Sequence, residues 1–206
     1  MPLKLFGTAR SRAIRNLWML HELGVPFEHV EVALGAEGSR KPEYLALNPN
    51  GRVPFIQDDG VVIWESLAIN LYLAKKHGGP LAPADVTEDG LMTMWTLWAA
   101  TEVEPMAAQA MYNTALYPPE QRDPKLVAQA LAALEAPLAV LEGALAKGGG
   151  HLVGGRFTVA DLNVIACVFY TRFTPAALAD KPGVRAWYAA GMARAGNRSA
   201  FALRGE

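Results

Sequence analysis

The stretch Asn48-Pro49-Asn50-Gly51-Arg52-Val53-Pro54 separates two patterns of strand and helix. Its asparagine, proline and glycine residues form a dense turn signal. Pro54 stands directly before an apolar run, where it removes one ladder donor and fixes the direction in which the chain enters a strand. If the Val53–Pro54 bond is cis, the main chain of Val53 is left as a free edge with which an extended peptide could pair. Turn chemistry alone fits an ordinary turn before a hairpin equally well.

The residues before this turn predict a strand, a helix and a second strand. Leu3-Lys4-Leu5-Phe6 is short and apolar and is ended by Gly7. Residues 11–23 carry one apolar face and stop at Gly24, as an amphipathic helix does. Residues 27–32 alternate apolar and polar side chains, which is typical of a half-buried strand. This order of elements allows the two strands to pair in parallel.

The residues after the turn predict a hairpin and a helix. Residues 55–57 and 61–64 are short apolar runs joined by Asp58-Asp59-Gly60, a pattern that predicts a β-hairpin. A helix follows from Ser66 to His77. Strand, helix, strand, loop, hairpin and helix is the order of a thioredoxin-like domain, which we therefore assign to residues 1–79.

The second half of the chain shows no strand pattern. Alanine- and leucine-rich stretches predict helices over residues 91–116, 124–145, 158–173 and 184–194. Pro105 should kink the first of these helices and Pro137 should bend the second. Thr158 and Asp161 are spaced to cap each other's main-chain N–H groups, which we interpret as folding chemistry. The fold class is therefore α/β plus all-α, with an all-helical C-terminal domain over residues 86–206.

Composition excludes several classes of protein. Apolar residues make up 51% of the chain and charged residues 19%, as in an ordinary globular protein. The formal net charge of −1 gives no basic stripe for nucleic acid. The four histidines and Cys167 give no metal-ligand spacing. We find neither a signal-peptide pattern nor an apolar run of about 20 residues, so we expect a cytoplasmic protein with no metal, no nucleic-acid partner and no membrane segment.

Two segments place hydroxyl groups at the start of a predicted helix. Thr8-Ala9-Arg10-Ser11 stands where thioredoxin-like redox enzymes carry Cys-x-x-Cys. Since it has no cysteine, thiol–disulfide exchange by the protein's own sulfur is nearly excluded. Ser66 could hold a carboxylate with its hydroxyl and the helix N–H groups, and Glu65 beside it could hold an ammonium. In both segments the alternative is a helix cap, with Glu65 merely solvated.

Together these segments resemble the cytosolic glutathione transferase superfamily along the whole chain. Asn48–Pro54 resembles the family turn N-P-x-G-x-V-P, and Trp64-Glu65-Ser66-Leu67-Ala68-Ile69 resembles its E-S-x-A-I motif. Gly7–Ala13 is similar to the serine-type bacterial, theta and delta members. In those members the catalytic hydroxyl lies three positions before an S-R-A stretch, which points to Thr8, with threonine in place of serine. Gly155–Asp161 resembles the family's helix-capping box.

The resemblance implies a site and a reaction. The glutathione thiolate would attack an electrophilic, hydrophobic small molecule, with Thr8 as first choice and Ser11 as second choice for the catalytic hydroxyl. The resemblance further implies a cis Val53–Pro54 bond, a homodimer and glutathione as cosubstrate. The glutathione-binding residues would be Arg10, Asn50, Arg52, Val53, Pro54, Glu65 and Ser66. Large aromatic residues on the helices could line the electrophile pocket, although such residues are more often core: Trp95, Tyr112 and Tyr117.

Two other functions stay open at this point. One is a glutathione-dependent disulfide reductase or peroxidase, which some bacterial-type relatives resemble in the first loop. The other is a non-catalytic glutathione transferase-like binding module. Backbone N–H groups of the first loop could also stabilise a thiolate without any side-chain hydroxyl. The sequence does not identify the electrophile.

Overall fold

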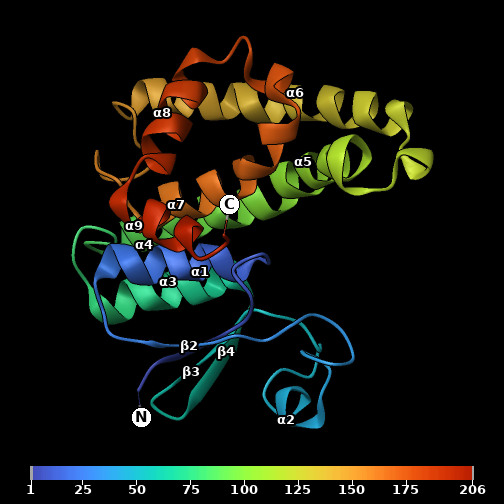
Figure 1. Ribbon diagram of the computed structural model, residues 1–206. Helices are drawn as coiled ribbons and strands as arrows, with labels where there is room; N and C mark the ends of the chain where they lie inside the picture. Colours follow the sequence, from blue (N-terminus) through green and yellow to red (C-terminus); the bar gives the residue numbers. More distant parts are fainter. Residues whose placement is uncertain (1, 206) are drawn as a thin grey trace. The chain divides into compact units, whose positions relative to one another are not determined.

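The computed structural model describes residues 2–205 and divides into two compact units (Figure 1). The first unit comprises Met1–Ala82 and Met192–Glu206, and the second comprises Pro83–Gly191. The first unit is a thioredoxin-like domain with a mixed sheet and the second is helical, as the sequence predicts. The bounds of the two domains expected from sequence, residues 1–79 for the thioredoxin-like domain and 86–206 for the all-helical domain, remain a prediction.

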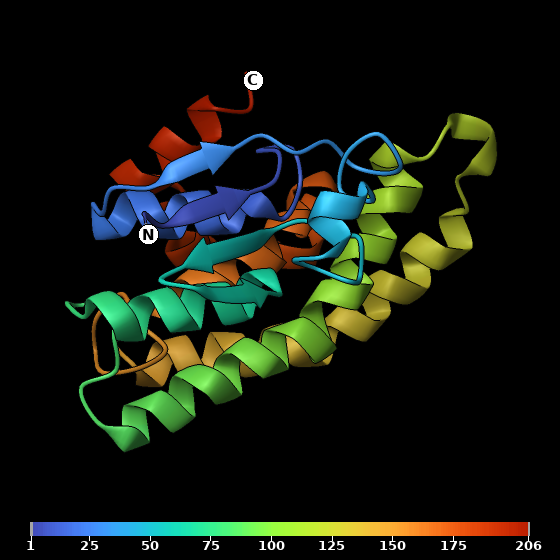
Figure 2. The ribbon, with the colours of Figure 1, turned by 90° about the horizontal axis from the view of Figure 1, so that it is seen from below.

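The first unit is built on a sheet in the order β2-β1-β3-β4 (Figure 2). The strands are β1 (Lys4–Phe6), β2 (Glu28–Val30), β3 (Phe55–Asp58) and β4 (Val61–Trp64). β1 and β2 pair in parallel, whereas β1 with β3 and β3 with β4 pair antiparallel. The predicted parallel pair and the predicted hairpin are both confirmed.

Helices pack against one face of the sheet, and an aromatic cluster packs against the other. Helices α1 (Ala13–Leu23) and α3 (Ser66–His77) lie side by side along one face. On the other face the rings of Phe6 and Phe55 stack with centroids 4.6 Å apart, and Tyr44 of the short helix α2 (Pro42–Leu45) packs against them. Because side chains alternate along a strand, both faces of β1 and β3 are buried.

Helix α9 (Ala195–Ala202), which the sequence analysis did not predict, packs on α1 within the first unit. The Glu22 carboxylate of α1 accepts hydrogen bonds from the Arg194 guanidinium at 2.8 and 3.0 Å and from Trp18 Nε1 at 2.9 Å. A Cβ at Gly196 would lie 2.7 Å from the Cγ of Glu22. Glycine at this position therefore permits the two helices to approach closely.

The second unit contains α4 (Val86–Trp98), α5 (Glu104–Met111), α6 (Pro124–Lys147) and α7 (Val159–Val168), and α8 (Pro182–Met192) begins within it. The helix expected over residues 91–116 runs from α4 through α5 with two π-helical turns, η1 (Ala99–Val103) and η2 (Tyr112–Leu116). The Glu104 N–H bonds the carbonyl of Ala99, five residues back, directly before Pro105, which has no N–H to donate. The remaining short helices are the 3₁₀ turns η3 (Pro119–Gln121), η4 (Phe169–Phe173) and η5 (Pro175–Leu178).

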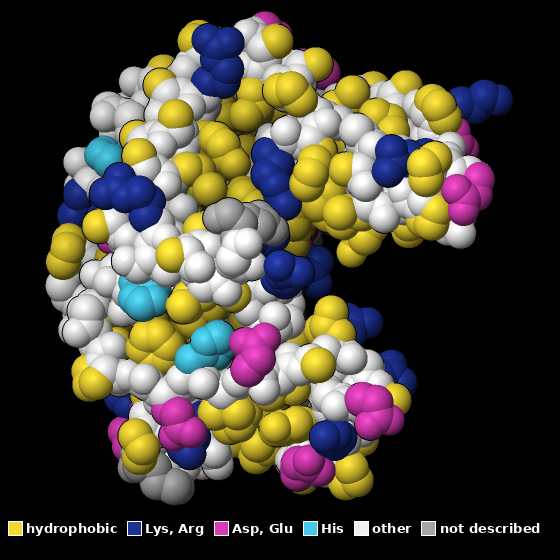
Figure 3. All heavy atoms as spheres, viewed as in Figure 1, with side chains coloured by type: hydrophobic (Ala, Val, Ile, Leu, Met, Phe, Trp, Pro, Cys, Tyr) yellow, Lys and Arg dark blue, Asp and Glu magenta, His cyan; other side chains and the backbone are white. Residues whose placement is uncertain are grey.

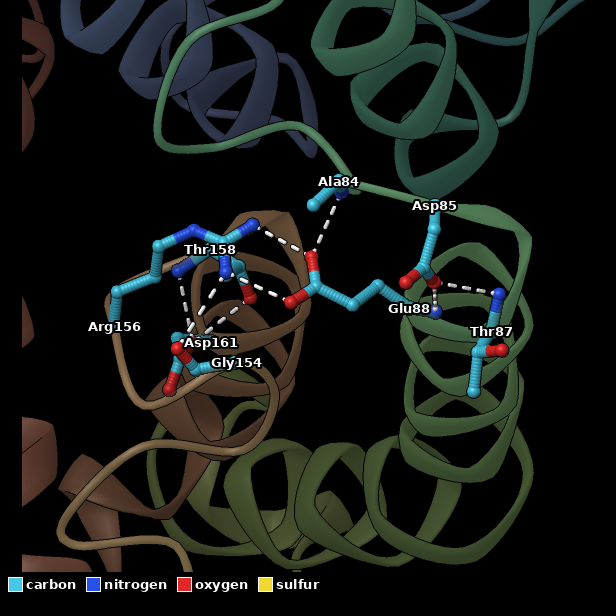
Figure 4. A network of polar contacts seen from close by, with 8 residues as sticks. All are labelled: Ala84, Asp85, Thr87, Glu88, Gly154, Arg156, Thr158 and Asp161. Atoms are coloured by element: carbon cyan, nitrogen blue, oxygen red, sulfur yellow. Dashed lines mark hydrogen bonds and ion pairs between the residues drawn. The ribbon is translucent and has the colours of Figure 1, made fainter.

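The start of α7 is the predicted capping box (Figure 4). The Thr158 N–H donates to Asp161 Oδ2 at 2.9 Å, and the buried Asp161 carboxylate also accepts from Trp187 Nε1 at 2.9 Å. Next to it, Arg156 and Glu88 form a bidentate ion pair. Arg156 Nη1 donates to Glu88 Oε1 at 2.9 Å, and Arg156 Nη2 donates to Glu88 Oε2 at 2.6 Å. α7 itself ends at Val168 rather than near Phe173 as predicted, because its last turn tightens into the 3₁₀ helix η4.

Among the described residues, helix α6 is the one helix that bears on the expectation of no membrane segment. It has 24 residues, and its most apolar window has a mean hydropathy of 1.4, so length and composition alone would let it cross a membrane. Core helices of ordinary globular proteins meet the same criteria. One stripe of α6 is buried within the second unit, where the helix packs on α5: Ala130, Leu134, Leu138, Leu141 and Leu145.

Candidate functional site

The strand register brings three loops to one end of the sheet in the first unit. Phe6 at the end of β1 pairs with Phe55 at the start of β3, and Phe55 pairs with Trp64 at the end of β4. The segment after Phe6, the turn before Phe55 and the helix start after Trp64 are therefore neighbours. These are the three segments that carry the candidate residues predicted from sequence.

Gly7 marks how closely two of these loops approach. Its φ of 145° lies outside the usual range of other residues, and a Cβ there would lie 2.9 Å from that of Ala13 and 3.2 Å from that of Val53. Only glycine therefore fits between the start of α1 and the 48–54 turn. Thr8, the first residue after it, is held beside that turn.

The two candidate hydroxyls of the first loop differ in their hydrogen bonds. Ser11 Oγ donates to the Thr8 carbonyl at 2.8 Å and accepts from the Ala13 N–H at 3.1 Å. Thr8 Oγ1 accepts a long bond of 3.4 Å from the Arg10 N–H, and in residues 2–205 its own proton has no acceptor. α1 begins at Ala13 with Arg12 as the cap residue, two residues later than the predicted start at Ser11.

Arg10 extends from the first loop toward the end of the chain. Its Nε and Nη2 atoms both lie 3.3 Å from the carbonyl oxygen of Arg204, and the side chain is exposed. The Arg10 side chain, predicted to contact a ligand, therefore already donates to a main-chain carbonyl just after the end of α9.

The 48–54 turn is held from within by Asn48, a buried residue that sequence analysis did not single out. Its Nδ2 donates to the Arg52 carbonyl at 2.8 Å, and its Oδ1 accepts from the N–H of Asn50 at 3.1 Å. The Val53–Pro54 bond is cis, as the resemblance implies. In the described part of the chain the main chain of Val53 makes no hydrogen bond, so it presents an open strand edge. The side chains of Asn50 and Arg52 are exposed.

Glu65 and Ser66 form the third segment. Glu65 has a φ of 73°, a backbone conformation that non-glycine residues rarely adopt and that is concentrated at functional sites. Its side chain is exposed, and no partner for it is found in residues 2–205. Ser66 is the first residue of α3 and is 5% exposed, so its hydroxyl lies where the helix N-terminus favours an anion.

Beneath Ser66 lies a layer of buried polar residues from α1 and α3. Arg15 Nη1 lies 3.3 Å from Ser66 Oγ. Asn16 Nδ2 donates to the Ser66 carbonyl at 2.8 Å and to Asn70 Oδ1 at 2.7 Å. Sequence analysis missed these residues because a polar residue inside a helical pattern gives no sign of its partner. The spacing of Arg15 and Asn16 on the inner side of an amphipathic helix was the available signal.

The geometry supports binding of an extended peptide that ends in an amino-acid head group. Glu65 offers a carboxylate for an ammonium, Ser66 and the start of α3 offer donors for a carboxylate, and Val53 offers a strand edge. Thr8 adds a hydroxyl next to that edge. Among the described residues no group of three or more histidine, cysteine, aspartate or glutamate side chains could hold a metal ion.

The second unit carries aromatic surface of its own. The rings of Tyr112 and Tyr117 stack with centroids 5.3 Å apart, and each side chain is 42% exposed. Hydrophobic side chains gather at the surface where α5 ends and α6 begins, on the right of the view (Figure 3). Trp95 is half-buried and contacts Trp98 edge to face. The two tyrosines are therefore surface residues rather than core.

Comparison with known proteins gives a consistent result. Residues 1–75 match the family described as glutathione S-transferase, N-terminal domain, and residues 124–190 match glutathione S-transferase, C-terminal domain. Glutathione S-transferase F13 of Arabidopsis thaliana is 33% identical, over 91% of this chain and 90% of the relative. Glutathione transferase F7 from Populus trichocarpa superposes with a TM-score of 0.86 at 27% identity, covering 98% of both chains. A theta class glutathione S-transferase from Xanthomonas axonopodis pv. citri, solved with glutathione bound, has a TM-score of 0.82 at 32% identity, covering 97% of both.

Proposed function

The chain belongs to the glutathione S-transferase family, and from that premise we propose that its glutathione site is the end of the sheet formed by Thr8, Val53, Glu65 and Ser66. The protein is a glutathione transferase that uses glutathione as its cosubstrate. The observation that carries the site assignment is the open Val53 edge, which lies between the Thr8 loop and the Glu65–Ser66 pair. These groups match the peptide, the thiol and the head group of glutathione.

In this proposal each part of glutathione has its own partner. The γ-glutamyl carboxylate accepts hydrogen bonds from Ser66 and the start of α3, while the neighbouring ammonium pairs with Glu65. The cysteinyl residue adds to the strand edge of Val53, next to Pro54. The exposed side chains of Asn50 and Arg52, with Arg10 from the first loop, contact the rest of the peptide.

Thr8 is our choice for the group that activates the thiol, with Ser11 as second choice. A free thiol has a pKa of about 8.5, so little thiolate exists at neutral pH. A hydrogen bond to a charged group contributes about 1.5–3 kcal/mol, which corresponds to roughly one to two pKa units. The Thr8 hydroxyl has its proton available, whereas that of Ser11 is used by the Thr8 carbonyl.

For the reaction, the protein then mainly holds glutathione in position and lowers the pKa of its thiol. The thiol releases its proton to solvent, and the thiolate sulfur forms a bond to an electrophilic carbon, from which the leaving group departs with its electron pair. Within the second unit, the exposed rings of Tyr112 and Tyr117 offer an apolar surface that suits a hydrophobic electrophile.

Subtype, assembly and location complete the proposal. The sequence motifs favoured the serine-type bacterial, theta and delta members, and the Xanthomonas enzyme supports that group. The plant relatives designated F favour the phi group more strongly. We further propose a cytoplasmic homodimer that binds neither nucleic acid nor membrane, on the strength of family membership and of the prevalence of symmetric dimers.

The test measures binding and turnover together. Titration calorimetry with glutathione should give a saturable site, and the purified protein should conjugate glutathione to an aryl halide. Activity on a glutathione mixed disulfide without activity on the aryl halide would favour a reductase instead. Absence of glutathione binding would favour a non-catalytic module.

A further inference from the structure

We propose that Arg15, a buried residue of α1, is a positioning residue that orients the Ser66 hydroxyl and makes the site selective for a carboxylate. This inference rests on the proposed glutathione site and extends it to a residue that does not need to touch the ligand. Its basis is the packing of α1 against α3, two helices that lie side by side (Figure 1). This packing brings Arg15 of α1 next to Ser66, the first residue of α3.

The contact between Arg15 and Ser66 fixes the direction of the serine proton. Arg15 is 3% exposed and Ser66 is 5% exposed, and Arg15 Nη1 lies 3.3 Å from Ser66 Oγ. A guanidinium has donors only, so the serine oxygen must accept this hydrogen bond. The Ser66 O–H therefore points away from Arg15 and is available to donate to a ligand.

The neighbouring amides hold the main chain of Ser66 in place. Asn16 Nδ2 donates to the Ser66 carbonyl at 2.8 Å and to Asn70 Oδ1 at 2.7 Å, and both asparagines are fully buried. Asn70 Nδ2 in turn lies 3.4 Å from the Arg15 carbonyl. With the backbone clamped between α1 and α3, the guanidinium is the group that sets the direction of the hydroxyl.

Charge gives Arg15 a second effect. An arginine guanidinium carries a positive charge in proteins, and that of Arg15 is buried, where electrostatic interactions are stronger than in water. An anion beside Ser66 is favoured by this charge in addition to the dipole of α3. A neutral group in the same place would gain from neither, so Arg15 should raise the preference for a carboxylate over an uncharged group.

This role predicts a particular kinetic pattern. Loss of Arg15 should weaken glutathione binding and raise the KM for glutathione. The pKa of the bound thiol and the kcat at saturating glutathione should stay the same, because the thiol lies at Thr8 and not at Ser66. A general loosening of the domain would change all of these quantities together.

The experiment compares two ligands on four proteins: the natural chain, Arg15→Met, Arg15→Lys and the exposed control Arg198→Met on α9. The ligands are glutathione and its analogue with a hydrogen in place of the γ-glutamyl carboxylate. The natural chain and the control should prefer glutathione by about 10- to 100-fold in Kd. Arg15→Met should lower this preference by about tenfold, while Ser66 and the dipole of α3 keep what remains of it. Arg15→Lys, which keeps the charge but loses the fork of donors, should fall between.

Three outcomes overturn the inference or its premise, and they can be told apart. If the natural chain does not bind glutathione, the proposed function fails. If the natural chain prefers glutathione and Arg15→Met keeps that preference, the role of Arg15 is wrong. If Arg15→Met does not fold, Arg15→Lys decides, and an undiminished preference there contradicts the proposal. Adding Arg15→Met to Ser66→Ala should raise the Kd by less than Arg15→Met does in the natural chain, since only the charge effect of Arg15 is left once the hydroxyl is gone.

Discussion

The hydroxyl of Ser11 donates a 2.8 Å hydrogen bond to the main-chain carbonyl of Thr8. The same oxygen accepts from the Ala13 N–H at 3.1 Å, at the first residue of α1. The Ser11 side chain therefore links two main-chain groups of the loop before α1, and its hydroxyl proton is already donated to one of them. Thr8 contributes only its carbonyl to this bond, so its own hydroxyl proton stays available.

Ser11→Ala should lower stability and leave the chemistry intact. The change removes the acceptor for the Ala13 N–H, an effect similar to the loss of a helix cap, which costs about 1 kcal/mol. Thermal unfolding should shift down, while the pKa of the bound glutathione thiol should not move. A raised thiol pKa in Ser11→Ala alone would reverse the choice between the two hydroxyls.

Ser66→Ala should weaken glutathione binding by about 1.5–3 kcal/mol, the contribution of a hydrogen bond to a charged group. Titration calorimetry measures this directly as a rise in Kd of roughly 10- to 100-fold. The matched control is Ser199→Ala, an exposed serine on α9 in the same unit. Equal dissociation constants for Ser66→Ala and the natural chain would count against the assignment of Ser66.

Asp161→Ala should be among the most destabilising changes in the second unit. It leaves the Thr158 N–H and the Trp187 indole N–H without their acceptor inside a buried site, which costs roughly 3 kcal/mol or more. The control is Asp123→Ala at the exposed start of α6, where Oδ1 accepts from the Lys125 N–H and the expected cost is about 1 kcal/mol. Chemical denaturation of both variants checks the difference, and equal losses would refute the buried role of Asp161.

The Glu88–Arg156 ion pair should make stability depend on acid pH. The hydrogen bonds from Arg156, followed by that from the Ala84 N–H, lower the pKa of Glu88 from 4.5 to about 2. A lowered folded-state pKa stabilises the fold above the unfolded value of 4.5, and this contribution is lost as pH falls toward 2. Glu88→Gln should therefore reduce the melting temperature at neutral pH and show a shallower decline between these pH values.

The control for this pH profile is Glu120→Gln, an exposed glutamate in the same unit. Its profile should follow that of the natural chain. A Glu88→Gln profile parallel to the natural one throughout the acid range would show that the ion pair contributes nothing to stability.

Much of the fold follows from local signals in the sequence. The hairpin strand Val61–Trp64 and the helix Ser66–His77 have the predicted bounds, because turn residues on either side define them. α9 was missed because its place depends on tertiary contacts, namely the Arg194–Glu22 ion pair and the fit of Gly196 against α1. No local pattern contains that information.

The candidate site was predictable to a similar extent. Each of its three loops carries a motif, and the strand register then brings them to one end of the sheet. Asn48 and Arg15 were not predicted, since their effect depends on partners reached only after folding, such as the Arg52 carbonyl and the Ser66 hydroxyl.

The central claim is that the Thr8 hydroxyl stabilises the glutathione thiolate. The most direct measurement is the ultraviolet thiolate absorbance of bound glutathione as a function of pH, in the natural chain and in Thr8→Ala. We predict that the pKa of the bound thiol rises by about one to two units in Thr8→Ala, with glutathione still bound. An unchanged thiol pKa in Thr8→Ala would contradict the claim and would point to main-chain N–H groups of the first loop as the donors.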